Sequence, residues 1–214
     1  MDHCKSSVSI FDKRAKDYEA KFMDFPHYQQ TYRPLLDMLQ GRSISLLDIG
    51  CGPGNVSQYL LAHHSELSVY GIDLSPQMVE LAQTNNPDAS FEVMDSRNIS
   101  SISSKFDCIV CGFCIPYLSP NETLKLFRDI ESLLNADGVL YLSCMEANAE
   151  QEMGIPRVQA SSSGEQMYTY HYSFNWLKKN LLIAGLDLLS YKKLLYPSEE
   201  AESVYDLFLY VTKK

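Results

Sequence analysis

The sequence lacks a long apolar run. None of its segments approaches the roughly 18 consecutive apolar residues that a membrane-spanning helix needs. The amino terminus, residues 1–7, leads into charged sequence and lacks the apolar centre of a secretory signal peptide. We therefore expect a cytoplasmic protein with no membrane partner.

The sequence also has little positive charge. Its 18 Lys and Arg residues stand against 27 Asp and Glu residues, which gives a formal net charge of −9 and an isoelectric point near 5.0. No run of Lys and Arg is longer than two residues. Because nucleic-acid binding relies on clustered basic side chains, we expect no nucleic-acid partner.

The six cysteines do not suggest a disulfide framework, because nothing else in the sequence marks a secreted protein. Cys108, Cys111 and Cys114 have a spacing found in some cluster-binding proteins. However, Cys108 and Cys111 lie three residues apart on one expected strand, so their side chains should point to opposite faces. We expect buried thiols and no metal site, with thiol chemistry of the arsenic-methylating kind as an open alternative.

The 214 residues are enough for one α/β domain, and from residue 43 the chain repeats a strand and then a helix. Ser119 and Glu122 form a capping box at the start of one such helix. We expect a Rossmann-like doubly wound sheet of five parallel strands plus a carboxyl-terminal antiparallel pair, seven in all, with helices on both faces. The expected strands are 44–49, 68–73, 89–94, 106–111, 138–143, 186–193 and 203–212; the expected helices include 55–62, one opening at Ser75-Pro76 and 173–184.

Residues 1–214 read as a single domain with four parts. Residues 1–42 should form helices that cover the ligand site: one over 9–23, and a second with Pro34 in its first turn that ends at Gly41. Residues 43–144 form the β/α core, and 173–214 form a terminal helix and strand pair. Residues 145–172 show no clear period, so we expect an irregular insert on the substrate side.

A glycine loop follows the first expected strand. The run Asp48-Ile49-Gly50-Cys51-Gly52-Pro53-Gly54 places three glycines at alternate positions between a strand and a helix. Glycine lets the backbone turn sharply and approach a ligand closely, and open α/β sheets bind ligands at such places. A dinucleotide fingerprint would need its third glycine one residue later, so this spacing disfavours a nucleotide-dependent oxidoreductase.

The same run resembles the signature loop of the class I S-adenosylmethionine-dependent methyltransferases, acid-x-Gly-x-Gly-x-Gly. Further marks of that family recur: Phe106-Asp107-Cys108-Ile109-Val110 resembles its fourth strand, and 133–140 resembles its turn into the fifth strand, with the proline and first glycine replaced. The resemblance covers about residues 43–212 and implies S-adenosyl-L-methionine as the cofactor, with S-adenosyl-L-homocysteine as the product.

Several residues follow as candidates for binding this cofactor. Asp73 ends the second strand, where a carboxylate can accept the ribose hydroxyl hydrogens. The resemblance places Asp95, followed by Ser96, at the adenine amino group, and Tyr18 over the cofactor. Asp48 either holds the glycine loop or contacts the methionine part. The full candidate set is Tyr18, Asp48, Gly50, Cys51, Gly52, Asp73, Leu74, Met78, Asp95, Ser96, Gly112 and Phe113, in which Leu74 and Met78 would flank the adenine.

Methyl transfer is an in-line displacement that needs alignment and exclusion of water, with a base where the acceptor carries a proton. Tyr117, after the fourth strand, and His171, in the insert, are the candidate catalytic residues. His171 could equally be a packing histidine. The insert's Tyr168, Tyr170 and Tyr172 suggest an apolar or aromatic acceptor pocket.

The chain lacks the Asn/Asp-Pro-Pro-Tyr motif of amino-methylating enzymes that act on nucleic acids and proteins. We therefore predict methyl transfer to a small organic acceptor. A non-catalytic sensor or partner subunit that binds S-adenosylmethionine is the first alternative, and a nucleotide-dependent oxidoreductase is the second.

Overall fold

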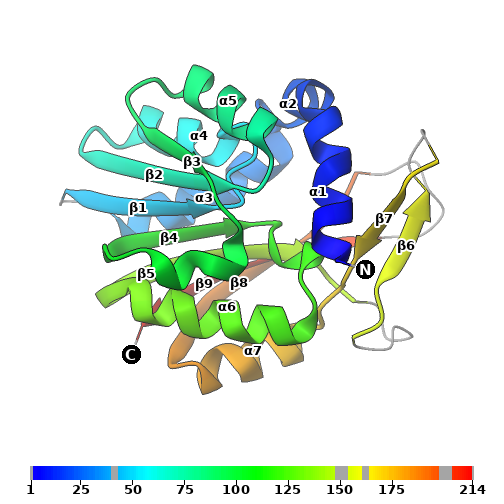
Figure 1. Ribbon diagram of the computed structural model, residues 1–214. Helices are drawn as coiled ribbons and strands as arrows, with labels where there is room; N and C mark the ends of the chain where they lie inside the picture. Colours follow the sequence, from blue (N-terminus) through cyan, green and yellow to red (C-terminus); the bar gives the residue numbers. More distant parts are fainter. Residues whose placement is uncertain (1, 40–42, 148–153, 161–163, 198–203, 214) are drawn as a thin grey trace.

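A computed structural model describes residues 2–39, 43–147, 154–160, 164–197 and 204–213. Its centre is a seven-stranded sheet with the order β3-β2-β1-β4-β5-β9-β8 (Figure 1). The five strands β1 to β5 are mutually parallel, and β9 runs antiparallel to both β5 and β8. The predicted fold class is therefore confirmed. The strands are β1 (Ile44–Ile49), β2 (Leu67–Asp73), β3 (Ser90–Val93), β4 (Phe106–Gly112), β5 (Leu134–Met145), β8 (Leu186–Leu195) and β9 (Tyr205–Lys213).

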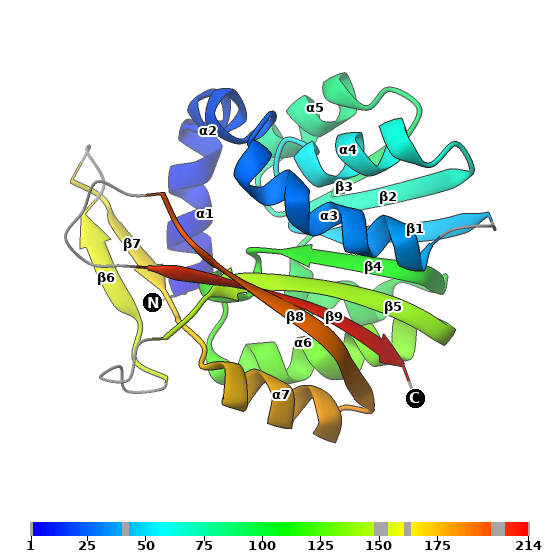
Figure 2. The same cartoon turned by 180° about the vertical axis from the view of Figure 1, so that it is seen from behind.

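Helices cover both faces of the sheet because each face carries its own apolar core. α3 (Pro26–Met38) and α4 (Asn55–His63) pack on one face, and α6 (Pro120–Leu133) and α7 (Phe174–Ile183) pack on the other. Seen from behind, α3 lies in front of the sheet while α6 and α7 run along its lower edge (Figure 2). In the described ranges every helix is too short or too polar to cross a membrane.

The sequence signals at element boundaries agree with the structure. Ser75 caps α5 (Pro76–Asn85) by accepting from the Met78 amide, and Ser119 and Glu122 form the expected capping box of α6. β5 begins four residues earlier than predicted, with an irregular register between Phe106 and Cys108 of the neighbouring strand. The first residues of β5 include the polar Asn135 and Asp137, and Asp137 has a positive φ. A prediction based on apolar residues alone therefore places the start of β5 too late.

Cys108 and Cys111 lie on opposite faces of β4, as their spacing predicts. Cys108 packs in the core beneath α3 and α4, whereas Cys111 packs beneath α6 and α7. Within the described ranges no three His, Cys, Asp or Glu side chains converge into a possible metal site.

The predictions for the amino-terminal helices were partly wrong. Instead of one helix over 9–23, the chain forms α1 (His3–Lys13) and α2 (Ala15–Phe22), separated at Arg14, whose φ of −115° and ψ of 22° leave the helical region. α3 begins at Pro26, so Pro34 lies inside the helix rather than in its first turn. Proline suits a first helical position because its φ is fixed and it needs no amide donor. The expected end at Gly41 lies outside the described residues.

The insert is more ordered than its sequence pattern suggested. β6 (Arg157–Ala160) and β7 (Gln166–Thr169) form an antiparallel hairpin, which stands beside α1 at one side of the sheet (Figures 1 and 2). Each strand has only four residues, too few for an alternating pattern to stand out. The serine run at 161–163 lies outside the described residues.

Gly54 is the residue whose replacement should most directly disturb the loop. It precedes α4 with φ of +81°, and an added Cβ would lie 2.4 Å from Nδ2 of Asn86 and 3.2 Å from Cα of Ala82. Gly164 has a similar φ of +80°, but an added Cβ there would meet no atom within 4 Å. We expect Gly54→Ala to lower the free energy of unfolding by about 2–4 kcal/mol and Gly164→Ala by only about 1 kcal/mol. Urea unfolding followed by circular dichroism measures both; equal losses would contradict the steric explanation.

Candidate functional site

A cavity opens at the carboxyl ends of the central strands, on the side where α1 and α2 cross the sheet. About 720 Å³ of space, part of it open to solvent, lies between its walls. Ten of the twelve predicted cofactor-binding residues line it, and so does Tyr117. The lining consists of Cys4, Val8, Phe11, Tyr18, Gly50, Gly52, Asp73, Leu74, Met78, Met94, Asp95, Ser96, Gly112, Phe113, Cys114, Tyr117 and Leu118.

The floor of the cavity is the glycine loop after β1. The amides of Gly50 and Cys51 both donate to the carbonyl of Ile72, at 2.8 and 3.0 Å, which ties the loop to the end of β2. Gly50 has φ of +68°, and a Cβ there would lie 3.0 Å from Cβ of Cys114. This position therefore needs glycine for its backbone conformation and for the close passage of the loop after β4.

Asp73 joins the end of β2 to the same loop. Its Oδ2 accepts from the Gly52 amide at 2.9 Å and its Oδ1 accepts from the Ser75 amide at 2.8 Å. Burial raises the pKa of this carboxyl, against the lowering effect of these backbone hydrogen bonds. Because each carboxylate oxygen can accept more than one hydrogen bond, Asp73 retains the capacity to bind ligand hydroxyls in the cavity that it lines.

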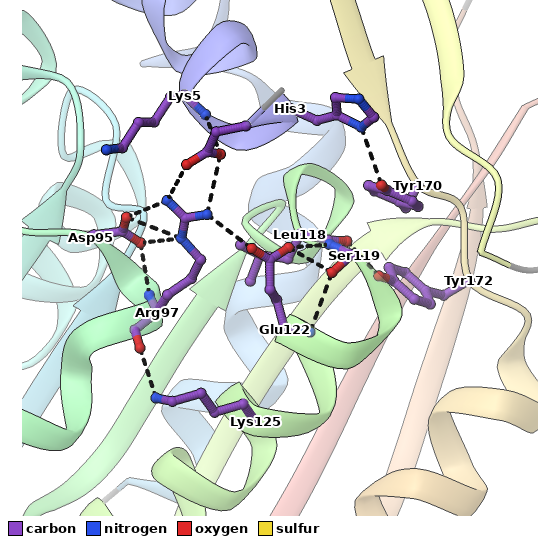
Figure 3. A network of polar contacts seen from close by, with 11 residues as sticks. His3, Lys5, Asp95, Arg97, Leu118, Ser119, Glu122, Lys125, Tyr170 and Tyr172 are labelled. Carbon is purple, nitrogen blue, oxygen red and sulfur yellow. Dashed lines mark hydrogen bonds and ion pairs between the residues drawn. The ribbon is translucent and has the colours of Figure 1, made fainter.

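Asp95 lies in the lining, but a neighbouring cation holds its carboxylate. Arg97 Nε donates to both oxygens, at 2.9 and 3.0 Å, and Arg97 Nη2 donates to Oδ2 at 2.6 Å (Figure 3). Although burial acts to raise it, these bonds keep the pKa of Asp95 below its usual range. The adenine contact implied by the family resemblance stays a prediction, and a ligand there would share Asp95 with Arg97.

Arg97 also reaches two other elements. Its guanidinium contacts Asp2, the N-cap of α1, at 3.0 Å and Glu122, in the first turn of α6, at 2.9 Å. Figure 3 shows this cation between three carboxylates from separate parts of the chain. The first turn of α1, which carries Cys4 into the cavity wall, is thereby tied to the site.

A second, smaller cavity of about 450 Å³ adjoins the first and shares Tyr18, Gly50, Gly52, Gly112 and Phe113 with it. The two remaining predicted cofactor residues, Asp48 and Cys51, line this cavity instead of the first. Its other walls are largely aromatic and come from α2, α3 and β5: Phe22, Tyr28, Tyr32 and Tyr141.

Asp48 is the buried carboxyl of the second cavity. Only 2% of its surface is exposed, and its Oδ2 accepts from Ser57 Oγ at 2.6 Å, in the first turn of α4. Burial raises the pKa of Asp48 to about 7, because the Ser57 hydrogen bond offsets only part of the desolvation. Asp48 thus both anchors α4 to β1 and presents a carboxyl that titrates near neutral pH.

Aromatic rings pack against one another in the cavity walls. Phe11 packs edge-on against Tyr18 and Tyr117, with ring centroids 5.8 and 5.1 Å apart. Phe113 stacks on Tyr28 at 5.1 Å and has a positive φ of 51°, which is rare for a bulky residue. Burial raises the pKa of Tyr117, so its hydroxyl stays protonated at neutral pH and suits donation of a hydrogen bond rather than removal of a proton.

His171 does not line either cavity. Burial and the charge of Arg157 lower its pKa to about 4, against the raising effect of a hydrogen bond to the Glu146 backbone. The prediction of a catalytic His171 therefore finds no geometric support, because the neutral histidine pairs with backbone away from the cavity. The alternative interpretation, that His171 is a packing histidine, agrees with its position.

The insert's tyrosines brace helices rather than line the cavities. The ring of Tyr168 stacks on His3 at 4.1 Å, and Ser7 bonds both the amide and the carbonyl of Tyr168. Tyr172 is fully buried and donates to the carbonyl of Leu118 at 2.6 Å. The expected tyrosine-lined acceptor pocket is thus absent from the described part of the insert.

Six residues that line the first cavity are absent from the predicted set: Cys4, Val8, Phe11, Met94, Cys114 and Leu118. The spacing of four between Cys4 and Val8 puts them on one side of α1, but the helix was expected to start only at residue 9. A start signal existed, because Asp2 is a good N-cap residue. Met94 and Leu118 carried no signal that distinguishes a cavity wall from a core position.

The raised pKa of Asp48 gives a testable dependence of stability on pH. An unfolded aspartate has the ordinary value of 3.8, so between about pH 4 and 7 the folded protein retains a proton that the unfolded chain releases. The contribution of the Asp48 carboxyl to the free energy of unfolding is therefore present at low pH and is lost as the pH rises to about 7. We therefore expect the difference in free energy of unfolding between Asp48→Asn and wild type to shift by about 1–3 kcal/mol in favour of the variant between pH 5 and pH 8.

Urea unfolding of the ligand-free protein across this pH range measures the effect. The exposed Asp88 supplies a matched control, Asp88→Asn. A gain for Asp48→Asn that does not change with pH would contradict a buried, titrating carboxyl.

Comparison with known proteins accounts for this arrangement. Residues 46–138 match the family described as Methyltransferase domain. Protein 235L of Invertebrate iridescent virus 6, which carries a provisional methyltransferase name, is 31% identical over 132 residues, covering 60% of this chain and 48% of that protein. Trans-aconitate 2-methyltransferase of Escherichia coli (strain ATCC 8739) is 36% identical over 93 residues, covering 44% of this chain and 36% of the enzyme. The chain spans less than half the length of these two relatives.

Solved structures extend the likeness to almost the whole chain. The 1,6-didemethyltoxoflavin-N1-methyltransferase of Burkholderia thailandensis, solved with 1,6-didemethyltoxoflavin and S-adenosylhomocysteine, matches with a TM-score of 0.72 over 98% of this chain and 88% of that chain. At 21% identity this likeness concerns the fold. The matched residues 46–138 hold the glycine loop, Asp73 and Asp95, so this stretch is a methyltransferase domain of the class I S-adenosylmethionine-dependent type.

Proposed function

We propose that this protein transfers a methyl group from S-adenosylmethionine to a small organic acceptor. The observation that carries the proposal is the joined pair of cavities over the glycine loop, with Asp73 at one end and Asp48 at the other. A long ligand with a nucleoside at one end and an amino acid at the other fits two connected cavities better than a compact one. Because the matched relatives extend well beyond this chain, the activity is proposed from the site and the family together.

The first cavity suits the adenosine part of the cofactor. Leu74, Met78 and Met94 supply apolar walls for a flat base. Asp73 supplies a carboxylate for the ribose hydroxyls, and its bonds to Gly52 and Ser75 fix its position before a ligand arrives. This preorganisation reduces the entropy lost on binding.

The second cavity suits the amino-acid part. Asp48 presents a buried carboxyl that can pair with an ammonium group, and Tyr18 and Tyr32 bring phenolic groups that can donate to a carboxylate. A bound ammonium would favour the ionised form of Asp48, so binding should strengthen as the pH rises through about 7.

When bound, S-adenosylmethionine supplies a methyl group on a sulfonium, which leaves as a neutral thioether and needs no acid. The chain's own contribution is alignment and exclusion of water. Phe11, Tyr18, Phe113 and Tyr117 form an aromatic wall around the junction of the two cavities. Tyr117 lines the first cavity, and its protonated hydroxyl could orient an acceptor there.

Incubation with methyl-labelled S-adenosylmethionine and a metabolite extract tests the activity. A methyltransferase gives a labelled small molecule and S-adenosylhomocysteine in equal amounts. Binding of S-adenosylhomocysteine without any labelled product would instead indicate a sensor or partner subunit. Thermal stabilisation by NAD alone would indicate an oxidoreductase and would contradict the proposal.

Asp73 offers the sharpest test of the cofactor site. We expect Asp73→Asn to weaken binding of S-adenosylhomocysteine at least tenfold, because the amide loses the charge and cannot accept from both Gly52 and Ser75. Asp12→Asn is the matched control, because Asp12 also bonds the start of α5, at Ser75 Oγ and the Gln77 amide, but does not line the cavities. Isothermal titration calorimetry should show less than a twofold change in the affinity of the control for S-adenosylhomocysteine. An equal loss of affinity in both variants would contradict a direct role of Asp73 in binding.

A further inference from the structure

We propose that Cys111 and Cys114 form a thiol–disulfide exchange site at the wall of the first cavity, and that the oxidised pair weakens binding of S-adenosylmethionine and S-adenosylhomocysteine. The co-reactant is a small disulfide that enters the cavity. The exchange follows from the positions of the two thiols, whereas its effect on ligand binding also rests on the proposed function.

The two cysteines have the spacing of a reactive thiol pair. The run Cys111-Gly112-Phe113-Cys114 is a Cys-x-x-Cys sequence at the carboxyl end of β4, and this spacing beside a β/α unit is typical of redox-active thiols. Cys108 and Cys111 have the same spacing but lie on opposite faces of β4. Of the two pairs, the second is therefore the one whose sulfurs can meet.

The thiols of this second pair are in contact. A hydrogen bond joins Cys111 to Cys114, on the side of the sheet that α6 and α7 cover. This hydrogen bond and burial raise the pKa of the Cys111 thiol, so Cys111 keeps its proton while the pair is reduced. A disulfide needs its sulfurs about 2 Å apart, so a modest movement of the loop after β4 converts the contact into a covalent bond.

A reagent can reach one thiol of the pair more readily than the other. Cys114 is partly exposed and lines the first cavity. Cys111 is fully buried and lines neither cavity. Access decides which thiol reacts first in thiol–disulfide exchange. Cys114 is therefore the attacking group, and Cys111 is the group that completes the protein disulfide.

The exchange balances in two steps. The thiolate of Cys114 attacks one sulfur of the small disulfide, whose S–S bond breaks, and the first leaving group takes up the proton that Cys114 released. The sulfur of Cys111 then attacks Sγ of Cys114, and its proton passes to the second leaving group as the protein disulfide forms. The protein gives up two electrons and two protons, and the small disulfide becomes two thiols.

A disulfide here would alter the walls of both cavities. Cys114 packs on the glycine loop, because a Cβ at Gly50 would lie 3.0 Å from its Cβ and 3.3 Å from its Sγ. Gly112 and Phe113, which the disulfide would bracket, line both cavities. Phe113 already has φ of 51°, and its amide donates to the carbonyl and Oγ of Ser143, each at 3.1 Å. A loop held this closely transmits the movement of Cys114 to the ligand site.

Cys4 is a second thiol in the wall of the first cavity, in the first turn of α1. Burial raises the pKa of Cys4 to about 12, and the nearby Cys114 contributes to this rise. A bond between Cys4 and Cys114 would join α1 to the loop, and it is the competing product. The hydrogen bond of Cys114 favours Cys111 as its partner.

Peptide mapping of the ligand-free protein tests the exchange. The protein is treated with hydroxyethyl disulfide, its remaining thiols are alkylated after unfolding, and chymotrypsin cleaves after Phe113, which separates the two cysteines. We expect linked peptides, with the bond assigned to Cys111 and Cys114 by tandem mass spectrometry. A bond from Cys114 to Cys4, a lasting mixed disulfide on Cys114, or an unreacted Cys114 would each overturn the assignment.

Two variants on β4 provide a matched comparison. Cys111→Ser should stop at the mixed disulfide on Cys114, whereas Cys108→Ser should form the same protein disulfide as wild type. Cys108 is the control because it is also 0% exposed and also lies three residues from Cys111. Circular dichroism checks that both variants fold; if either does not, the wild-type peptide map decides. Equal loss of the disulfide in both variants would contradict the assignment.

Calorimetry with S-adenosylhomocysteine measures the effect on binding. We expect the oxidised protein to bind at least about tenfold more weakly than the reduced protein, and dithiothreitol to restore the affinity. By linkage, saturating S-adenosylhomocysteine should make the disulfide easier to reduce by the same factor, and tenfold corresponds to about 30 mV.

The outcomes separate this inference from the proposed function. A disulfide that leaves the affinity for S-adenosylhomocysteine unchanged would overturn the effect on binding and leave the proposed function standing. Failure of the reduced protein to bind S-adenosylhomocysteine would overturn the proposed function, and the peptide map would still decide whether Cys111 and Cys114 exchange.

Discussion

The structure depends on how the glycine loop is fastened to the neighbouring strand. Two amides of the loop share the carbonyl of Ile72, and a third, that of Gly52, reaches the side chain of Asp73. These bonds set the floor of the first cavity and the position of its carboxylate at the same time. The loop also continues into α4, where Ser57 in the first turn donates a hydrogen bond to Asp48. The same short segment therefore organises the second cavity, which Asp48 lines. A ligand site of this kind is built mainly from backbone.

A second constraint comes from charge. Arg97 gathers carboxylates from the start of α1, the end of β3 and the start of α6, so that one side chain holds three separate elements together. Its positive charge is paired within this junction. Among the residues that the structure describes, the buried carboxyls Asp48 and Asp73 have no such cation in their cavity walls, and this difference gives the cavities their negative character.

The sequence predicted the sheet and most of the first cavity well, because both depend on local signals. The strands are apolar runs, the helix caps are serine with proline, and the cavity residues follow strand ends in a regular way. The break at Arg14 and the β6–β7 hairpin could not be predicted in this way. Arg14 starts α2 without a side-chain cap hydrogen bond, and each hairpin strand has only four residues. The position of His171 in the insert predicted a place near the site, but His171 lines neither cavity.

The attachment of α1 has a consequence for the wall of the first cavity. The helix is held at its first residues by Arg97 and along its side by β7, through Ser7 and the stacking of His3 on Tyr168. Any displacement of α1, whose Cys4, Val8 and Phe11 line the first cavity, would therefore have to break both attachments together. The surface hairpin thus holds one wall of the cavity in place without lining it.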